Sequence, residues 1–193
     1  MVLALYETWP EGMDALCVGV GSDVVLDDTI GPLAATGLGR SVGPEFVLGH
    51  IADPVDGPLV EEIRHSLPTD RFIIVLDAAP TRKPEEVGQV YFQGCPARPG
   101  SGVGRASAPF GDVTLGGFAP FADAPFPTAG RGILRPIRLR EIILTVGAIV
   151  EVVQAARMLR LPHLTAYRDK MPNVDAIVAL VRQRLARRRA AGT

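Results

Sequence analysis

The chain has little cysteine and little net charge, the features that mark disulfide-rich proteins and nucleic-acid-binding proteins. It holds two cysteines in 193 residues, Cys17 in an apolar run and Cys95 in a Gly/Pro-rich stretch. This favours two free thiols in a reducing compartment over a disulfide framework. The formal net charge is only −1, which argues against a surface built to bind nucleic acid. The length fits one domain with its own core, so we expect a single domain over residues 1–193.

Export and membrane features are also lacking. The first residues, MVLALYETWPEGMD, have no basic segment before their short apolar stretch, and an acid follows at Glu7. This is not the pattern of a secretory signal. No apolar run looks long enough to cross a bilayer. We therefore expect a cytoplasmic protein that has no membrane partner.

Short apolar runs alternate with helical patterns along the chain. Ala15–Gly19 and Phe72–Leu76 are unbroken apolar runs, as in strands buried on both faces, and the second is expected to be central. Shorter strands are expected at 46–48, 87–92 and 113–115. Such alternation predicts an α/β fold, a three-layer α/β/α sandwich.

The helices are predicted from spacing and from caps. The first is expected from Asp28, as its N-cap, to about Leu38, and apolar residues three and four apart predict another over Leu59–Leu67. The same spacing from Leu139 to Ala156 predicts a long helix that packs across the sheet. A last helix, about 173–189, carries a basic end that we interpret as solvated.

Two aspartates follow the two strongest strand predictions. Asp28 stands where the first strand gives way to a helix, and Asp77 directly follows Phe72–Leu76. The carboxyl ends of parallel strands meet at one edge, where open α/β folds gather catalytic groups. Two nearby carboxyls that share a proton can supply both the base and the acid that peptide hydrolysis needs. From position alone, Asp28 could equally cap its helix and Asp77 close a turn.

The segment Gly94–Gly104, GCPARPGSGVG, is dense in glycine. Its backbone N–H groups could form a nest for an anion or oxyanion, and a tight turn would explain the glycines equally well. The spacing fits neither a dinucleotide fingerprint nor a P-loop. Arg98 could bind an acidic group. Ser101 lies outside a G-x-S-x-G elbow, so a serine-hydrolase triad is not expected.

Asp27 and His50 raise the question of a metal site. A metal at this edge would need a third ligand, and His50 is the only histidine predicted near it, in no recognised ligand motif. We therefore interpret Asp27 as an added surface charge and expect neither a metal nor a cofactor.

Three ordered motifs resemble the germination proteases of spore-forming bacteria, above all the shorter YyaC-type spore proteases. Asp28, Gly31 and Pro32 match the acid, Gly and Pro of the family's nucleophile region. Ile73–Ala78 (IIVLDA) is similar to the strand that ends in Asp-Ala. Pro99–Gly104 (PGSGVG), with Phe110–Asp112 after it, is similar to the glycine-rich loop and the Val-Gly-Asp turn.

The resemblance implies the phosphorylase/hydrolase-like form of the sandwich, shared with hydrogenase-maturation proteases. It implies that Asp28 and Asp77 are the catalytic pair. It also implies that the glycine-rich loop borders the cleft for a protein or peptide substrate, through Gly100, Ser101, Gly102 and Gly104 with Arg98 beside them.

We therefore expect an aspartate-dependent endopeptidase of a spore-forming cell that cleaves spore proteins in the mother cell, forespore or spore interior. A catalytically silent sporulation scaffold or binding protein and a metal-dependent maturation protease remain as alternatives. The apolar stretch around Phe118, Phe121 and Phe126 is expected to be covered by the domain's own helices or by a second copy of the chain. A homo-oligomer is therefore possible.

Overall fold

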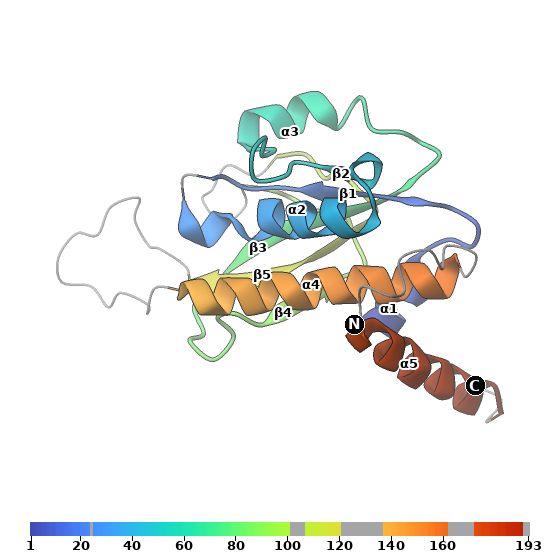
Figure 1. The fold of residues 1–193 in the computed structure, drawn as a ribbon. Coiled ribbons are helices and arrows are strands. Elements are labelled where there is room, and N and C mark those ends of the chain that lie inside the picture. Colours follow the sequence, from blue (N-terminus) through green and yellow to red (C-terminus); the bar gives the residue numbers. More distant parts are fainter. Residues whose placement is uncertain (24, 101–106, 121–136, 162–171, 191–193) are drawn as a thin grey trace.

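The apolar runs of the sequence form the strands of one sheet (Figure 1). The computed structural model describes residues 1–23, 25–100, 107–120, 137–161 and 172–190. The five-stranded sheet has the order β2-β1-β3-β5-β4. Its strands are β1 (Ala15–Gly19), β2 (Val47–Leu48), β3 (Phe72–Thr81), β4 (Val90–Gln93) and β5 (Val113–Pro120). Neighbouring strands are parallel except for β4, which runs antiparallel to β5 at one edge.

Helices cover both faces of the sheet, because residues along the central strands alternate between two apolar clusters. Phe72, Ile74 and Leu76 join the cluster under most of the helices, whereas Ile73 and Val75 join the cluster under a single helix. The first face carries α1 (Val2–Thr8), α2 (Ile30–Val42), α4 (Leu139–Arg160) and α5 (Pro172–Ala190), and the second carries α3 (Gly57–Ile63). The predicted three-layer α/β/α sandwich is confirmed, with β3 at its centre.

Several local predictions need correction. Asp28 is not an N-cap: it ends the short 3₁₀ helix η1 (Leu26–Asp28), and Thr29 is the N-cap of α2. Asp77 does not end its strand, because β3 continues to Thr81 along β5. The helix expected from Asp28 runs on to Val42, and Phe46 belongs to a second 3₁₀ turn, η2 (Pro44–Phe46), rather than to β2.

The chain also forms a helix before the first predicted strand. Trp9 directly follows α1 in the chain. Its side chain is fully buried and stacks on Phe72 at 5.7 Å between ring centroids, and its indole N–H donates to the Met13 carbonyl oxygen. The Arg160 guanidinium at the end of α4 lies over the Tyr6 ring at 4.1 Å and donates to its carbonyl oxygen. These contacts fix α1 against α4 on the first face of the sheet.

The prediction that no apolar run is long enough to cross a bilayer is wrong for the long helix α4. Among the described helices it alone has the length and composition of a spanning segment, with a mean hydropathy of 1.8 over its most apolar window. Half of that window is buried inside the structure, where Ile142, Ile149 and Val153 face the sheet side. The predicted packing of this helix on the sheet is therefore confirmed.

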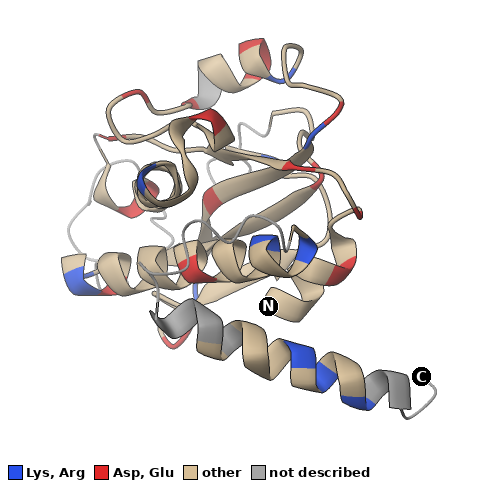
Figure 2. Cartoon of the chain, turned by 45° about the vertical axis from the view of Figure 1, so that its right-hand side comes forward, with Lys and Arg blue, Asp and Glu red and all other residues tan. Residues whose placement is uncertain are grey.

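Both cysteines are free, as predicted: Cys17 is buried in β1 and Cys95 is exposed. Burial raises the pKa of the Cys17 thiol to about 12. The basic end of α5 is exposed at Arg182, Arg184 and Arg187 (Figure 2). Phe118 is half-buried against the Tyr91 ring, whereas Phe121 and Phe126 lie outside the described residues.

Candidate active site

Asp28 is placed at the carboxyl edge of the sheet by close backbone packing. After β1 the chain continues in a strand-like path, with the Val20 N–H donating to the Leu76 carbonyl at 2.8 Å. The helix α2 then begins directly over the ends of β1 and β3. A Cβ at Gly31 would lie 2.3 Å from the Val20 oxygen and 2.4 Å from the Leu76 oxygen. Only glycine permits this approach, which fixes the turn that carries Asp28.

The same turn needs a second glycine. Gly21 has φ +142, and a Cβ there would lie 2.0 Å from the Asp28 carbonyl oxygen. The Ser22 N–H donates to that oxygen at 3.2 Å. Because the backbone of Asp28 is held in this way and Thr29 takes the N-cap position, the Asp28 side chain is not used to cap the helix.

Asp77 extends the face of β3 that carries Ile73 and Val75. It is partly buried, and its Oδ1 accepts from the Ala78 N–H at 2.8 Å. The turn η1 packs against both β3 and β5, which brings Asp28 and Asp77 to the same edge of the sheet. We call these two residues the acid pair.

The environment shifts both acids toward the neutral form. Desolvation by burial raises the pKa of Asp28 to about 6, with a smaller increase from the Asp27 charge, against a lowering by the Ser22 backbone N–H. Desolvation raises the pKa of Asp77 to about 7, with a smaller increase from the Asp28 charge, against a lowering by the Ala78 N–H. The acid pair is therefore electrostatically coupled, and burial favours the protonated form of each carboxyl.

Asp27 is more than a remote surface charge. It is partly buried, burial raises its pKa, and its charge raises the pKa of Asp28. Its side chain thus lies close enough to Asp28 to act on it, whereas the sequence was interpreted as giving only an added surface charge.

Tyr91 is the residue of this site that the sequence did not single out. In the sheet register Gly116 of β5 stands opposite Asp77 on one side and opposite Tyr91 on the other. Burial and the Asp77 charge both raise the pKa of the Tyr91 hydroxyl, so Tyr91 lies close to the acid pair. The segment was expected to be a strand, but its antiparallel register cannot be read from one sequence.

The described part of the glycine-rich segment, residues 94–100, lies at the other edge of the sheet. Ala97 and Phe110 exchange backbone hydrogen bonds of 3.0 and 3.1 Å, and Asp112 binds the Ile73 backbone at the start of β3. Arg98 and Gly100 are exposed beside this anchor. Ser101, Gly102 and Gly104 lie outside the described residues, so the predicted border of the cleft stays a prediction.

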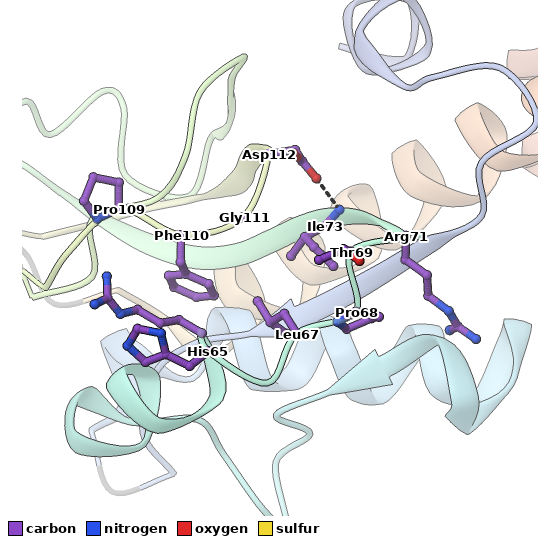
Figure 3. A pocket seen from close by; sticks show the side chains of 11 residues that line it. His65, Leu67, Pro68, Thr69, Arg71, Ile73, Pro109, Phe110, Gly111 and Asp112 are labelled. Atoms are coloured by element: carbon purple, nitrogen blue, oxygen red, sulfur yellow. Dashed lines mark hydrogen bonds between the residues drawn. The ribbon is translucent and has the colours of Figure 1, made fainter.

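A groove of about 460 Å³ lies at this amino-terminal edge (Figure 3). Arg64, His65 and Arg71 line it with Phe110 and Asp112. The Asp112 carboxylate is already used, since it accepts from the Ile73 N–H at 2.7 Å. The lining includes neither member of the acid pair, so this groove is not the candidate active site.

Among the described residues, the carboxyl edge holds no donor set for a metal. Within the described residues, which include Asp27, Asp28, Asp77 and His50, no group of three or more His, Cys, Asp or Glu side chains is placed to hold an ion. His50 follows β2 and is exposed. We therefore derive no step through a metal.

Three solved structures are similar to the chain. The NiFe hydrogenase maturation protease HycI from Thermococcus kodakarensis KOD1 has 18% identity and a TM-score of 0.49, over 78% of this chain and 99% of that one. The protease HybD from Thermococcus kodakarensis has 15% identity and a TM-score of 0.43, over 74% and 97%. The hydrogenase 2 maturation peptidase from Thaumarchaeota archaeon SCGC_AB-539-E09 has 17% identity and a TM-score of 0.45, over 74% and 97%.

Sequence comparison gives the family. No curated protein matches the chain. Residues 3–152 match the model of a family described as "Protein of unknown function (DUF1256)". This segment holds the whole sheet, the acid pair and Tyr91. Because the match covers most of the chain, the protein belongs to the DUF1256 family.

Proposed function

We propose that the protein hydrolyses peptide bonds with the acid pair. The observation that carries the proposal is the coupling of two carboxyls, delivered by separate elements to one edge of the sheet, with pKa values raised to about 6 and about 7. Groups with such shifts at the carboxyl edge of a parallel sheet are typical of active sites. The proposal rests on this geometry rather than on similarity to solved structures.

The chemistry follows from the shared proton. After the pair has lost one proton, its carboxylate accepts a proton from a water molecule as the water oxygen bonds to the peptide carbonyl carbon. The carbonyl π electrons move to the oxygen. The remaining carboxylic acid then protonates the amide nitrogen. The electron pair on the oxygen re-forms the C=O bond as the C–N bond breaks, and the products are a carboxylic acid and an amine. The pair titrates as a unit, so the two roles belong to the pair.

The structure weakens the purely structural role of Asp28. A capping aspartate would accept from backbone N–H groups of the first helical turn, whereas α2 has Thr29 as its N-cap and no side-chain cap bond. A structural acid would also gain stability from ionisation, but burial opposes ionisation of both Asp28 and Asp77. Such a cost is expected where function requires the group.

The substrate class comes from the motif resemblance. Asp28, Gly31 and Pro32, together with Asp77, match positions of the germination proteases and of the YyaC-type spore proteases. We propose spore proteins as substrates, cleaved in the cytoplasm of the mother cell, in the forespore or in the spore interior.

The test is turnover by matched variants. Asp28→Asn and Asp77→Asn keep the shape of each side chain but cannot ionise, so cleavage should fall at least about 100-fold with either change. Asp27→Asn removes a neighbouring acid and should leave cleavage within a few fold. The measurement is cleavage of an acid extract of small basic spore proteins, followed by mass spectrometry, with the thermal midpoint of each variant recorded.

Three other outcomes would contradict the proposal. Unaltered cleavage in either Asn variant would remove that residue from the mechanism. Loss of cleavage on chelation, restored by one divalent metal, would favour the metal-dependent maturation protease. No cleavage by the unmodified protein would favour a scaffold or binding protein of sporulation.

A further inference from the structure

Tyr91 lies in a row of residues that crosses the sheet beside the acid pair. Asp77 on β3, Gly116 on β5 and Tyr91 on β4 are direct neighbours in the register. Residues that stand opposite one another in a sheet project their side chains from the same face. Asp77 and Tyr91 therefore rise from one face, with only a glycine between them.

The missing side chain at Gly116 makes room for the Tyr91 ring. A Cβ at Gly116 would lie 2.8 Å from both the Cε1 and the hydroxyl oxygen of Tyr91. The Cε1 and hydroxyl end of the ring thus lies over Gly116 of β5, between the edge strand and β3. A larger residue at position 116 would close the path between Tyr91 and Asp77.

The Tyr91 ring is positioned by a contact with Phe118 and by hydrogen bonds of the backbone that precedes it. The Tyr91 and Phe118 rings pack at 5.0 Å between centroids. The Phe118 N–H donates to the Gln89 carbonyl and the Gly88 N–H donates to the Phe118 carbonyl, both at 2.9 Å. The Thr145 hydroxyl of α4 donates to the Gly88 carbonyl at 2.6 Å. These bonds fix β4 against β5 just before Tyr91.

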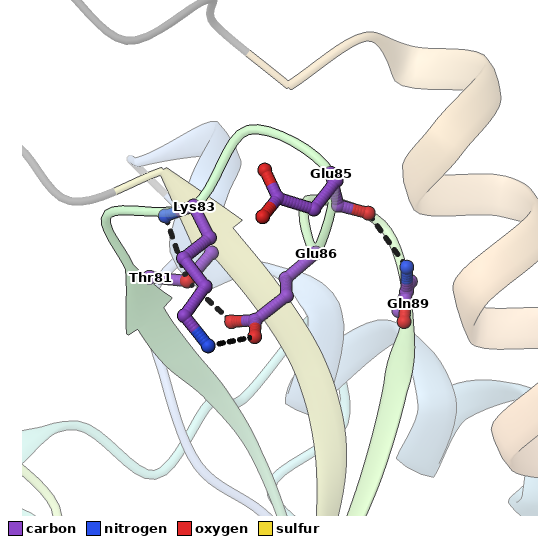
Figure 4. A network of polar contacts seen from close by, with 5 residues as sticks. All are labelled: Thr81, Lys83, Glu85, Glu86 and Gln89. Carbon is purple, nitrogen blue, oxygen red and sulfur yellow. Dashed lines mark hydrogen bonds and ion pairs between the residues drawn. The ribbon is translucent and has the colours of Figure 1, made fainter.

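The turn that leads into β4 is also closed by polar contacts (Figure 4). The Thr81 hydroxyl and the Lys83 ammonium each donate to the Glu86 carboxylate at 2.7 Å. The Gln89 amide donates to the Glu85 carbonyl at 2.6 Å. These contacts join the two ends of the turn before β4 begins, which limits the rearrangement that Tyr91 needs to meet a ligand, as a preorganised donor requires.

Among the described residues, no hydrogen bond joins the Tyr91 hydroxyl to another group, which leaves it available to a ligand. Desolvation and the nearby Asp77 charge raise its pKa further above neutrality, so the phenol keeps its proton at neutral pH and can donate a hydrogen bond.

We propose that Tyr91 is a catalytic residue that donates a hydrogen bond to the carbonyl oxygen of the scissile peptide bond, from the face of the sheet shared with Asp77. The inference rests on the proposed peptidase function. As water adds to the carbonyl carbon, this oxygen gains negative charge, and the neutral phenol stabilises it without giving up its proton. The acid pair is then left to handle the two protons of the reaction.

The test is the Tyr91→Phe variant, which keeps the ring over Gly116 and removes only the hydroxyl. Loss of a donor to a developing oxyanion lowers kcat by roughly 100-fold to 1,000-fold. We expect a fall at the lower end of this range, with KM and the thermal midpoint nearly unchanged. The probe is a fluorogenic peptide that spans the first cleavage site found in the spore-protein extract.

Two controls separate this role from packing. Tyr6→Phe makes the same chemical change on α1, where the ring contacts Arg160 instead of the acid pair, and should leave kcat unchanged. Phe118→Leu weakens the ring packing but keeps the Tyr91 hydroxyl, and should lower the thermal midpoint more than it lowers kcat. The pH limits of activity should be the same in Tyr91→Phe as in the unmodified protein, because they belong to the acid pair.

The outcomes distinguish the two proposals. Unchanged kcat in Tyr91→Phe, while Asp77→Asn is inactive, would overturn the role of Tyr91 and leave the peptidase intact. A fall in kcat that Phe118→Leu reproduces would show that packing alone is at work, and would also overturn it. No cleavage by the unmodified protein would overturn both proposals together.

Discussion

At the scale of single residues, ionisation of the buried acid pair lowers the stability of the folded protein. The ordinary pKa of an aspartate is 3.8, whereas desolvation by burial raises the pKa of Asp77 in the folded protein to about 7. The native state therefore binds more protons than the unfolded state between these values. The contribution of Asp77 to the free energy of unfolding is therefore highest below about pH 4. This contribution is lost as the pH rises through 7.

Asp77→Asn tests this directly. The amide keeps an oxygen for the Ala78 N–H but carries no charge to desolvate, so the variant should be more stable than the unmodified protein at pH 8. The expected gain is on the order of 2 kcal/mol, since one pKa unit is worth about 1.4 kcal/mol and partial exposure reduces the full value. Urea unfolding at pH 8 and pH 4.5 measures it, and the gain should shrink at the lower pH. An equal or lower stability at pH 8 would show that Asp77 is not strained in its ionised form.

At the scale of elements, the site depends on how closely α2 begins over the ends of β1 and β3. The carbonyl oxygens of Val20 and Leu76 leave no space for a side chain at Gly31. Both oxygens belong to the backbone, and the Leu76 oxygen also accepts from the Val20 N–H, so neither is the mobile end of a side chain. The Gly and Pro of the first motif thus serve the geometry that presents Asp28.

Gly31→Ala should therefore be strongly destabilising, by about 3 kcal/mol, which is the upper end for overpacked sites. Gly147→Ala in the exposed part of α4 is the matched control, because a Cβ there meets nothing within 4 Å. The control should gain about 0.5 to 1 kcal/mol, as alanine favours a helix over glycine. Thermal unfolding of both variants gives the comparison. A tolerated Gly31→Ala would mean that α2 can draw away from the strand ends.

At the scale of the whole molecule, α4 has the length of a membrane span and yet serves as a core helix. One side contacts α1, α2 and the sheet, and Ile142, Ile149 and Val153 are buried there. Leu139, Ile143 and Leu144 lie on the other side, each more than half exposed. Moving α4 into a bilayer would expose the rest of the core to water, at roughly 25 cal/mol for each Å² of apolar surface.

We accordingly expect the protein to stay in the aqueous phase when a detergent solution is warmed through its cloud point. The matched variant is Ile143→Lys, which adds a charge to the exposed side of α4 and should leave both the partitioning and the fold unchanged. Transfer of the unmodified protein into the detergent phase, abolished by Ile143→Lys, would show that this side of the helix meets lipid.

The sequence was sufficient for the general plan because that plan depends on local patterns. Unbroken apolar runs predicted the central strand β3, and three-to-four spacing predicted α4. The acid after each of two such runs predicted that Asp28 and Asp77 would come to one edge, since carboxyl ends of parallel strands meet there. The same local reasoning failed at Asp28 itself, where an N-cap was expected and a 3₁₀ turn formed, because Gly21 and Gly31 let the chain pack more tightly than cap statistics describe.

By itself, then, the sequence determined the layers of the fold, because the spacing of apolar residues distinguishes strands from helices. It also determined that the two acids lie at one edge of the sheet, because each stands where a strand was predicted to give way to a turn or helix. Only the tertiary structure decided how far the acids are desolvated, that Asp27 lies close enough to influence Asp28, and that Tyr91 is a neighbour of Asp77. Burial and charge coupling depend on all the elements that surround a group, and a single sequence does not contain these distances. The place of Tyr91 follows from the antiparallel register of an edge strand across Gly116, which pairs residues far apart in the chain.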